Sequence, residues 1–244
     1  ISFEELLKSQ PGNSYYFQKV VDCHQQLQQF SIAEKLIQDR LNVYKQASLL
    51  VELGYNYQLG KDLVKAEKYY EEALNRIRKN PNEVYGVAAT FEKKVLLDYA
   101  LQSYELASAL MPNFNFNYQM AVLYGQRGNT DMMIDKFLTE AYTNPHNSII
   151  IQNQLSRFMN EDANATFNET LRKSLLLRAQ KNQDVFWNQY LSWFYVQQKE
   201  YGKAFIQEKA IYKRNPETFS NIVNLATLTI EEKEQETAKE ILSF

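Results

Sequence analysis

The chain has 244 residues, and its 27 basic residues nearly balance its 29 acidic ones, for a formal net charge of -2. This balance argues against a general nucleic-acid binder, which needs a basic stripe to neutralise phosphates. No apolar run approaches the roughly 18 residues of a membrane-spanning helix. Cys23 is the single cysteine, so an internal disulfide is excluded, and we expect Cys23 to be a buried or half-buried small residue.

Two series of residues recur along the chain at a period of about 34 residues, which predicts a stack of small units. The prolines fall at one phase, at single or double intervals: Pro11, Pro81, Pro112, Pro145 and Pro216. A second series keeps the same period: Ala33, Ala66, Ala100, Met133, Thr170, Ala204 and Ala238. The interval from Met133 to Thr170 is a few residues longer, and we place the excess in the polar run 161–166.

Apolar residues recur at spacings of three and four, and glycine is scarce, so each unit reads as two antiparallel helices. In chain order we expect helices over 14–28 and 31–44, 46–59 and 62–79, 82–94 and 96–110, 114–126 and 129–143, 147–160 and 167–181, 184–197 and 200–214, 217–228 and 232–244. Residues 1–10 are expected to pack as a lone helix on the first complete unit. The units are approximately 1–11 (partial), 12–45, 46–81, 82–112, 113–145, 146–183, 184–216 and 217–244 (partial).

The connections carry their own signals. Gly60, Gly128 and Gly202 lie near the junctions between paired helices, where glycine tolerates the left-handed conformation that closes a helix. Asn-Pro pairs at 80–81, 144–145 and 215–216 are expected to end units, because the residue before proline is displaced from helical geometry. Asn164 and Asn168 each begin an N-glycosylation acceptor pattern, which can also arise by chance in an Asn-rich chain.

The phase at both ends predicts a slice of a longer repeat protein. Residues 1–11 read as the tail of a second helix, and 232–244 read as a second helix whose apolar edge is left uncapped. A signal peptide or an anchor could lie outside this slice, so the compartment stays open between the cytoplasm and a bacterial envelope.

Several units resemble the tetratricopeptide repeat (TPR). One unit has Leu53-Gly54-x2-Tyr57 followed by Ala66-x3-Tyr70-x2-Ala73, and the next keeps Ala100-x3-Tyr104-x2-Ala107-x4-Pro112. Others keep Tyr124, Phe137 and Pro145, or Leu191, Tyr195, Ala204 and Pro216. The resemblance implies an all-α, right-handed solenoid of antiparallel helix pairs. More weakly, the chain is similar to long TPR proteins of Bacteroidota, which would favour an envelope-facing assembly protein.

Residues for catalysis or metal binding are sparse. Only His24 and His146 exist, far apart in the sequence, whereas a zinc site needs three or four converging ligands. The sequence contains no glycine-rich phosphate loop, H-E-x-x-H or G-x-S-x-G motif. We therefore expect no enzyme activity, no cofactor and no metal.

The resemblance implies that the first helix of each unit lines a concave groove that holds a protein or peptide partner. The residues placed there are Tyr15, Gln18, Tyr55, Gln58, Tyr85, Tyr118, Phe186, Gln189 and Trp193. Tyrosine and tryptophan are enriched at binding hot spots, and glutamine can bond a peptide backbone. Packing between units is the competing role for each aromatic residue.

The groove positions also argue against one familiar use of the fold. A chaperone-tail clamp would need cations, but the corresponding pairs are Gln18 and Asp22, Val51 and Tyr55, and Tyr85 and Ala89. Two alternatives to a peptide-binding scaffold remain: a structural spacer in a larger assembly and, less favoured by charge, a helical-repeat RNA reader.

Overall fold

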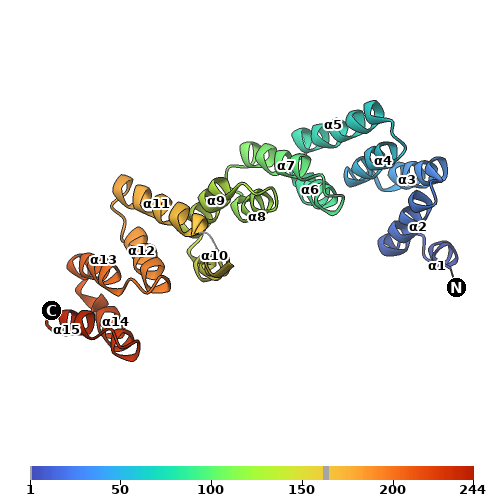
Figure 1. The fold of residues 1–244 in the computed structure, drawn as a ribbon. Coiled ribbons are helices and arrows are strands. Elements are labelled where there is room, and N and C mark those ends of the chain that lie inside the picture. Colours follow the sequence, from blue (N-terminus) through green and yellow to red (C-terminus); the bar gives the residue numbers. More distant parts are fainter. Residues whose placement is uncertain (1, 162–164) are drawn as a thin grey trace. The chain divides into compact units, whose positions relative to one another are not determined.

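A computed structural model describes residues 2–161 and 165–244, and all regular secondary structure in those two ranges is helical (Figure 1). The all-α prediction is confirmed. The chain forms two compact units, residues 1–127 and residues 128–244, each of which is described by itself below.

The first unit stacks antiparallel helix pairs, α2 on α3, α4 on α5 and α6 on α7, with α1 packed on α2. Its helices are α1 (Phe3–Ser9), α2 (Ser14–Gln26), α3 (Phe30–Tyr44), α4 (Ser48–Leu59), α5 (Leu63–Lys79), η1 (Pro81–Glu83), α6 (Val84–Lys93), α7 (Leu97–Leu110) and α8 (Asn117–Gln126).

The second unit contains the pairs α12 with α13 and α14 with α15, while α9, α10 and α11 pack on one another. Its helices are α9 (Thr130–Thr143), η2 (Pro145–Asn147), α10 (Ser148–Glu161), α11 (Thr166–Lys181), α12 (Val185–Gln197), α13 (Tyr201–Arg214), η3 (Pro216–Thr218), α14 (Phe219–Glu231) and α15 (Gln235–Leu242). The predicted boundaries agree with these helix ends to within about three residues.

Most residues of the series that begins with Ala33 occupy one buried position of the second helices. Ala33, Ala66, Ala100, Met133, Ala204 and Ala238 are each the fourth residue of a second helix, and all are buried. Thr170 was assigned wrongly to this series. It is the fifth residue of α11, it is half-buried, and Phe167 and Leu171 are the buried residues beside it.

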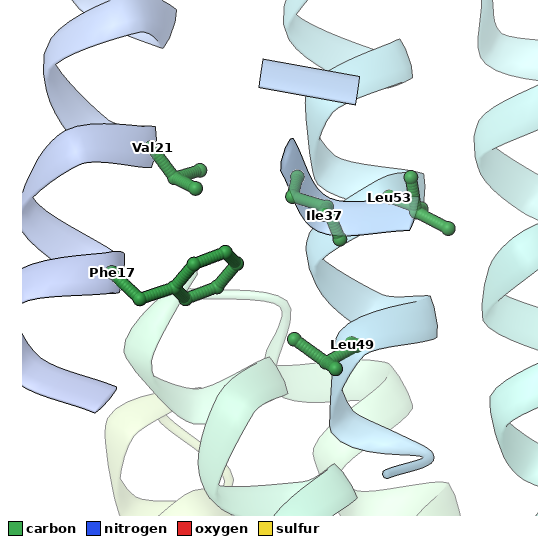
Figure 2. Packing of buried hydrophobic residues seen from close by; sticks show 5 residues of the cluster. All are labelled: Phe17, Val21, Ile37, Leu49 and Leu53. Atoms are coloured by element: carbon green, nitrogen blue, oxygen red, sulfur yellow. The ribbon is translucent and has the colours of Figure 1, made fainter. Parts of the chain in front are cut away.

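Apolar side chains from consecutive helices form the core of each stack. In the first unit, Phe17 and Val21 of α2 face Ile37 of α3 and Leu49 and Leu53 of α4 (Figure 2). All five are at most 5% exposed, so each contributes roughly 1.5–3 kcal/mol of hydrophobic free energy.

Large rings close the junctions between successive pairs. Tyr70 of α5 is 2% exposed, and its ring centroid lies 5.5 Å from that of Phe91 and 4.9 Å from that of Tyr99. Tyr104 of α7 takes the same place against Phe116, at 5.6 Å. Burial raises the pKa of both tyrosine hydroxyls.

The turns inside the helix pairs share one conformation. The residue with positive φ recurs at the 34-residue period: Gln28, Lys61, Val95, Gly128, Lys199 and Lys233. In most of these turns the next N–H bonds the carbonyl five residues back, as in Asp62 N to Tyr57 O at 2.9 Å. This is the Schellman closure of a helix. The prediction that glycine supplies the conformation holds for Gly128 and is wrong for Gly60, whose φ is -75°, and for Gly202, which lies within α13.

At three connections between helix pairs, proline begins the next segment. Pro81, Pro145 and Pro216 each start a short 3-10 helix at its first residue, where the missing N–H is tolerated. Asn80 before Pro81 has φ -140° and ψ 94°, so it has left helical geometry as expected of a residue before proline.

Arginines near the end of second helices donate hydrogen bonds to the connection that precedes their own helix pair. Arg40 donates to the carbonyls of Pro11 and Gly12 at 3.0 and 3.2 Å. Arg76 donates to the carbonyl of Lys45 at 2.8 Å, and Arg214 to that of Gln183 at 3.1 Å. These bonds satisfy backbone acceptors that the turns leave unpaired.

Leu7 of α1 packs against the core of the first unit, so the predicted lone helix is confirmed. In α15, Ala238 and Ile241 are buried while Leu242 is 68% exposed. None of the helices among the described residues is long and apolar enough to cross a membrane.

Two smaller expectations concern single residues. Cys23 is exposed, which contradicts the expected burial. Asn168 lies in α11, and its amide nitrogen, the atom that glycosylation would modify, donates to the carbonyl of Met159 at 3.4 Å. Asn164 lies outside the described residues.

Candidate partner-binding surface

A charged cluster links α2, α4 and α6, which are the first helices of three consecutive helix pairs in residues 1–127. Lys94, the residue that follows α6, extends back so that its Nζ lies 3.0 Å from Glu52 Oε2 of α4 and 3.5 Å from Asp22 Oδ1 of α2. The same Nζ lies 4.6 Å from the centroid of the Tyr55 ring. Gln18 donates to Asp22 Oδ1 at 2.9 Å, so two predicted residues, Gln18 and Tyr55, belong to one network.

Burial makes this cluster a fixed part of the surface. The side chains of Lys94 and Glu52 are only 6% and 5% exposed, whereas that of Asp22 is 30% exposed. Taking charges out of water is costly unless they are paired, and an unpaired buried partner would destabilise the fold strongly. Lys94 is therefore held in place by its two carboxylates.

A hollow of about 350 Å³ opens beside the cluster. Its lining comes from α2, α4 and the end of α6: Asp22, Gln25, Gln26, Tyr55, Leu59, Lys93 and Lys94. A second hollow of about 410 Å³ shares Gln25, Gln26 and Leu59 and extends over the two neighbouring turns. The two together present amide, hydroxyl and charged groups around the half-buried Tyr55 ring. We call this region the Tyr55 hollow.

Gln58 serves the packing within its own helix pair. The hydroxyl of Tyr70 donates to Gln58 Oε1 at 2.9 Å. The next pair repeats this contact, with Tyr104 donating to Glu92 Oε1 at 3.0 Å. The repeated bond gives Gln58 a structural role beside its predicted contact with a partner.

The other predicted residues of the first unit lie at separate places. Tyr15 is 59% exposed and packs edge-on to Phe3 of α1, with 6.1 Å between ring centroids. Tyr85 is 49% exposed beside Phe116, at 5.8 Å, and Tyr118 is half-buried in α8. The structure joins neither Tyr15 nor Tyr85 to the Tyr55 hollow by any described contact.

In residues 128–244, the predicted residues follow one side of α12. Phe186 stacks on the buried Tyr190 with 4.7 Å between ring centroids, and Trp193 lies 5.8 Å from the same ring. Phe186 and Trp193 are half-buried, whereas Gln189 is exposed. The hydroxyl of Tyr190 is bonded to Ser148 and burial raises its pKa to about 12, so Tyr190 is the structural member of this aromatic set.

The main group missed from the sequence is Lys94. The cations on the groove face were expected to be absent, yet this lysine lies among the first helices, with its charge neutralised by two carboxylates. Val51, expected to face the groove, is fully buried. The described residues contain no cluster of three or more histidine, cysteine, aspartate or glutamate side chains that could hold a metal.

No protein-family model matches the chain, and no curated protein matches it. Similar solved structures include the C-terminal part of a TPR repeat-containing protein from Cytophaga hutchinsonii, at 17% identity and a TM-score of 0.37, covering 88% of each chain. A tetratricopeptide repeat protein from Parabacteroides merdae has 18% identity and a TM-score of 0.37, covering 99% of this chain and 93% of that one. The human IFIT1 dimer with m7Gppp-AAAA has 15% identity and a TM-score of 0.35, covering 99% of this chain and 64% of that one. The chain thus has TPR-repeat structural neighbours, two of them from Bacteroidota, at low sequence identity.

Proposed function

We propose that the chain is a non-catalytic module that binds a protein segment, and that the Tyr55 hollow is one place where the segment docks. The observation that supports this most directly is the lining of the hollow by three consecutive first helices. A segment that crosses such a surface contacts each helix pair in turn, which is how a stacked array recognises an extended partner.

The chemistry of the lining favours a polypeptide. Lys94, the most buried cation of the hollow, is already paired with Asp22 and Glu52, so it is not available to a phosphate backbone, and the remaining cations, Lys93 and Lys61, are exposed. Gln25 and Gln26 carry both donors and acceptors, which suit the N–H and C=O groups of a peptide. Tyr55 adds contact area at a low cost in side-chain entropy.

A continuous groove that also includes Phe186 and Trp193 remains a prediction, since these residues belong to the other unit. The proposal therefore needs only the surface of residues 1–127.

Site-specific photocrosslinking tests the proposal. A benzophenone amino acid replaces Tyr55 in one variant and Val64, which is 81% exposed on a second helix, in the control. We expect a discrete adduct with a cellular protein from position 55 and none from position 64. Adducts at both positions or at neither would contradict the proposal, and a nuclease-sensitive adduct would indicate an RNA reader.

The adducted protein then allows a quantitative test. Tyr55→Ala should weaken its binding by about 1–2 kcal/mol, the scale of an interface hot spot. Val64→Ala is the matched control and should leave the affinity unchanged. Equal affinities of Tyr55→Ala and wild type in a binding titration would refute a role for this hollow.

A further inference from the structure

One helix of residues 128–244, α13, departs from a packing pattern that α5, α7 and α9 share. In α5, α7 and α9 the eighth residue is a buried ring: Tyr70, Tyr104 and Phe137. In α13 the eighth residue is Glu208, which is only 8% exposed. A carboxylate therefore stands where α5, α7 and α9 place a buried ring.

The residue that faces Glu208 also differs from its counterpart in α4. Tyr70 lies against Gly54 of the preceding helix. Ser192 of α12 is the residue that corresponds to Gly54, because it precedes Ala204 by the same number of residues as Gly54 precedes Ala66. The hydroxyl of Ser192 donates to Glu208 Oε1. Glu208 Oε2 is buried and has no hydrogen-bond partner among the described residues.

The missing ring leaves a hollow of about 250 Å³ between α12, α13 and α14. Its lining is Ser192, Val196, Glu208, Asn221, Asn224, Leu225 and Leu228. Glu208 and Ser192 are buried while Asn221 and Asn224 are exposed, so the carboxylate lies at the closed end and the amides lie at the mouth. Val196, Leu225 and Leu228 supply apolar walls between them.

We propose that this hollow binds a basic side chain, lysine or arginine, of a protein segment. Such a side chain combines an aliphatic stem, which fits the apolar walls, with a cationic head, which suits the unpaired oxygen of Glu208. The amide oxygens of Asn221 and Asn224 accept further N–H groups at the mouth. A buried carboxylate oxygen without a partner is costly, and a cation bound to Glu208 Oε2 removes that cost. This site is separate from the Tyr55 hollow and does not depend on it.

The test is a titration of the whole chain, followed by NMR, with capped tripeptides Ala-Xaa-Ala in which Xaa is arginine, lysine or the neutral arginine analogue citrulline. We expect the arginine or lysine peptide to shift the side-chain amide signals of Asn221 and Asn224 in a saturable way. The citrulline peptide should bind about tenfold more weakly or worse, because the charge-assisted bond is lost. Equal binding of citrulline, or no saturable shift with either cation, would overturn the proposal.

Two variants separate the site from general stability. Glu208→Gln keeps the shape and removes the charge, and it should weaken the basic peptide about tenfold. Glu217→Gln, on an exposed carboxylate of η3, is the matched control and should bind as wild type does. Glu208→Phe fills the hollow with a ring and removes the carboxylate, so it should abolish binding. Undiminished binding by a folded Glu208→Phe would refute this location.

Discussion

The contact between Gly54 and Tyr70 allows a test of the packing in which the same substitution has opposite effects at two sites. A Cβ atom at Gly54 would lie 2.4 Å from Tyr70 Cε1 and 3.0 Å from the carbonyl oxygen of Ala66. At Gly86 of α6 the nearest atom to an added Cβ is Ser48 Cβ, at 3.7 Å, which is an ordinary contact. We therefore expect Gly54→Ala to destabilise the chain and Gly86→Ala to stabilise it.

The magnitude follows from two opposing contributions. Replacing glycine by alanine inside a helix gains about 1 kcal/mol of helix propensity at either site. At Gly54 overpacking opposes this gain with about 1–3 kcal/mol, and the Tyr70 ring cannot move aside easily, because Phe91 and Tyr99 enclose it and Gln58 holds its hydroxyl. Because the propensity contribution is common, the difference in stability between the two variants measures the clash alone.

Urea unfolding followed by circular dichroism measures both variants. The midpoint should fall for Gly54→Ala and rise for Gly86→Ala, with unchanged dependence on urea, because the area exposed on unfolding is the same. In a Tyr70→Leu background the penalty of Gly54→Ala should shrink, as coupling between contacting residues requires. A Gly54→Ala variant as stable as Gly86→Ala would refute the close crossing of α4 and α5.

Two further predictions concern a turn and the buried hydroxyls. Val95 is β-branched, 76% exposed and has φ 58°, so Val95→Gly should raise the urea midpoint by relieving strain of about 1–2 kcal/mol, less the entropy that glycine adds to the unfolded chain. Val64→Gly within α5 is the control and should lower the midpoint. A lower midpoint for Val95→Gly would show that the turn carries no strain. Burial raises the pKa of Tyr190 to about 12, so the folded state holds that proton more tightly than the unfolded state, whose pKa is about 10, and stability is lost as pH rises through this window. The urea midpoint should therefore be lower at about pH 11 than at about pH 8, with tyrosinate absorbance rising together with unfolding; tyrosinate that forms in the folded chain without loss of stability would contradict this reasoning.

The helices were predictable because their signals are local and repeated. The fourth residue of most second helices is a small, buried residue, so Ala66 and Ala100 indicated which face of each helix is buried. The phase failed at Thr170, where the longer connection places Phe167 and Leu171 at the buried positions instead.

The turns and the charged cluster were harder to predict for a different reason. Schellman bonds impose the left-handed conformation on whatever residue follows the helix cap, so Lys61 adopts it even though Gly60 is adjacent. Lys94 reaches its carboxylates because its long stem crosses from the end of α6 to α2 and α4, a contact between helix pairs that no spacing within one helix reveals. Tyr55 was predictable as a half-exposed ring, but its cationic neighbour was not.

The exchange of a ring for Glu208 also bears on how folding cooperativity passes along residues 128–244. In a stacked array each pair is stabilised mainly through its interface with the next, and the array behaves as one unit only while those interfaces are strong. The junction that α13 makes with α14 includes a carboxylate and two asparagines beside its apolar residues, so we expect it to transmit less of that coupling than a junction closed by an aromatic ring. We therefore expect amide-proton exchange to show the pair α14 and α15 opening as a subdomain of its own, and we expect a bound cation that neutralises Glu208 to bring it back into a single cooperative transition with α12 and α13.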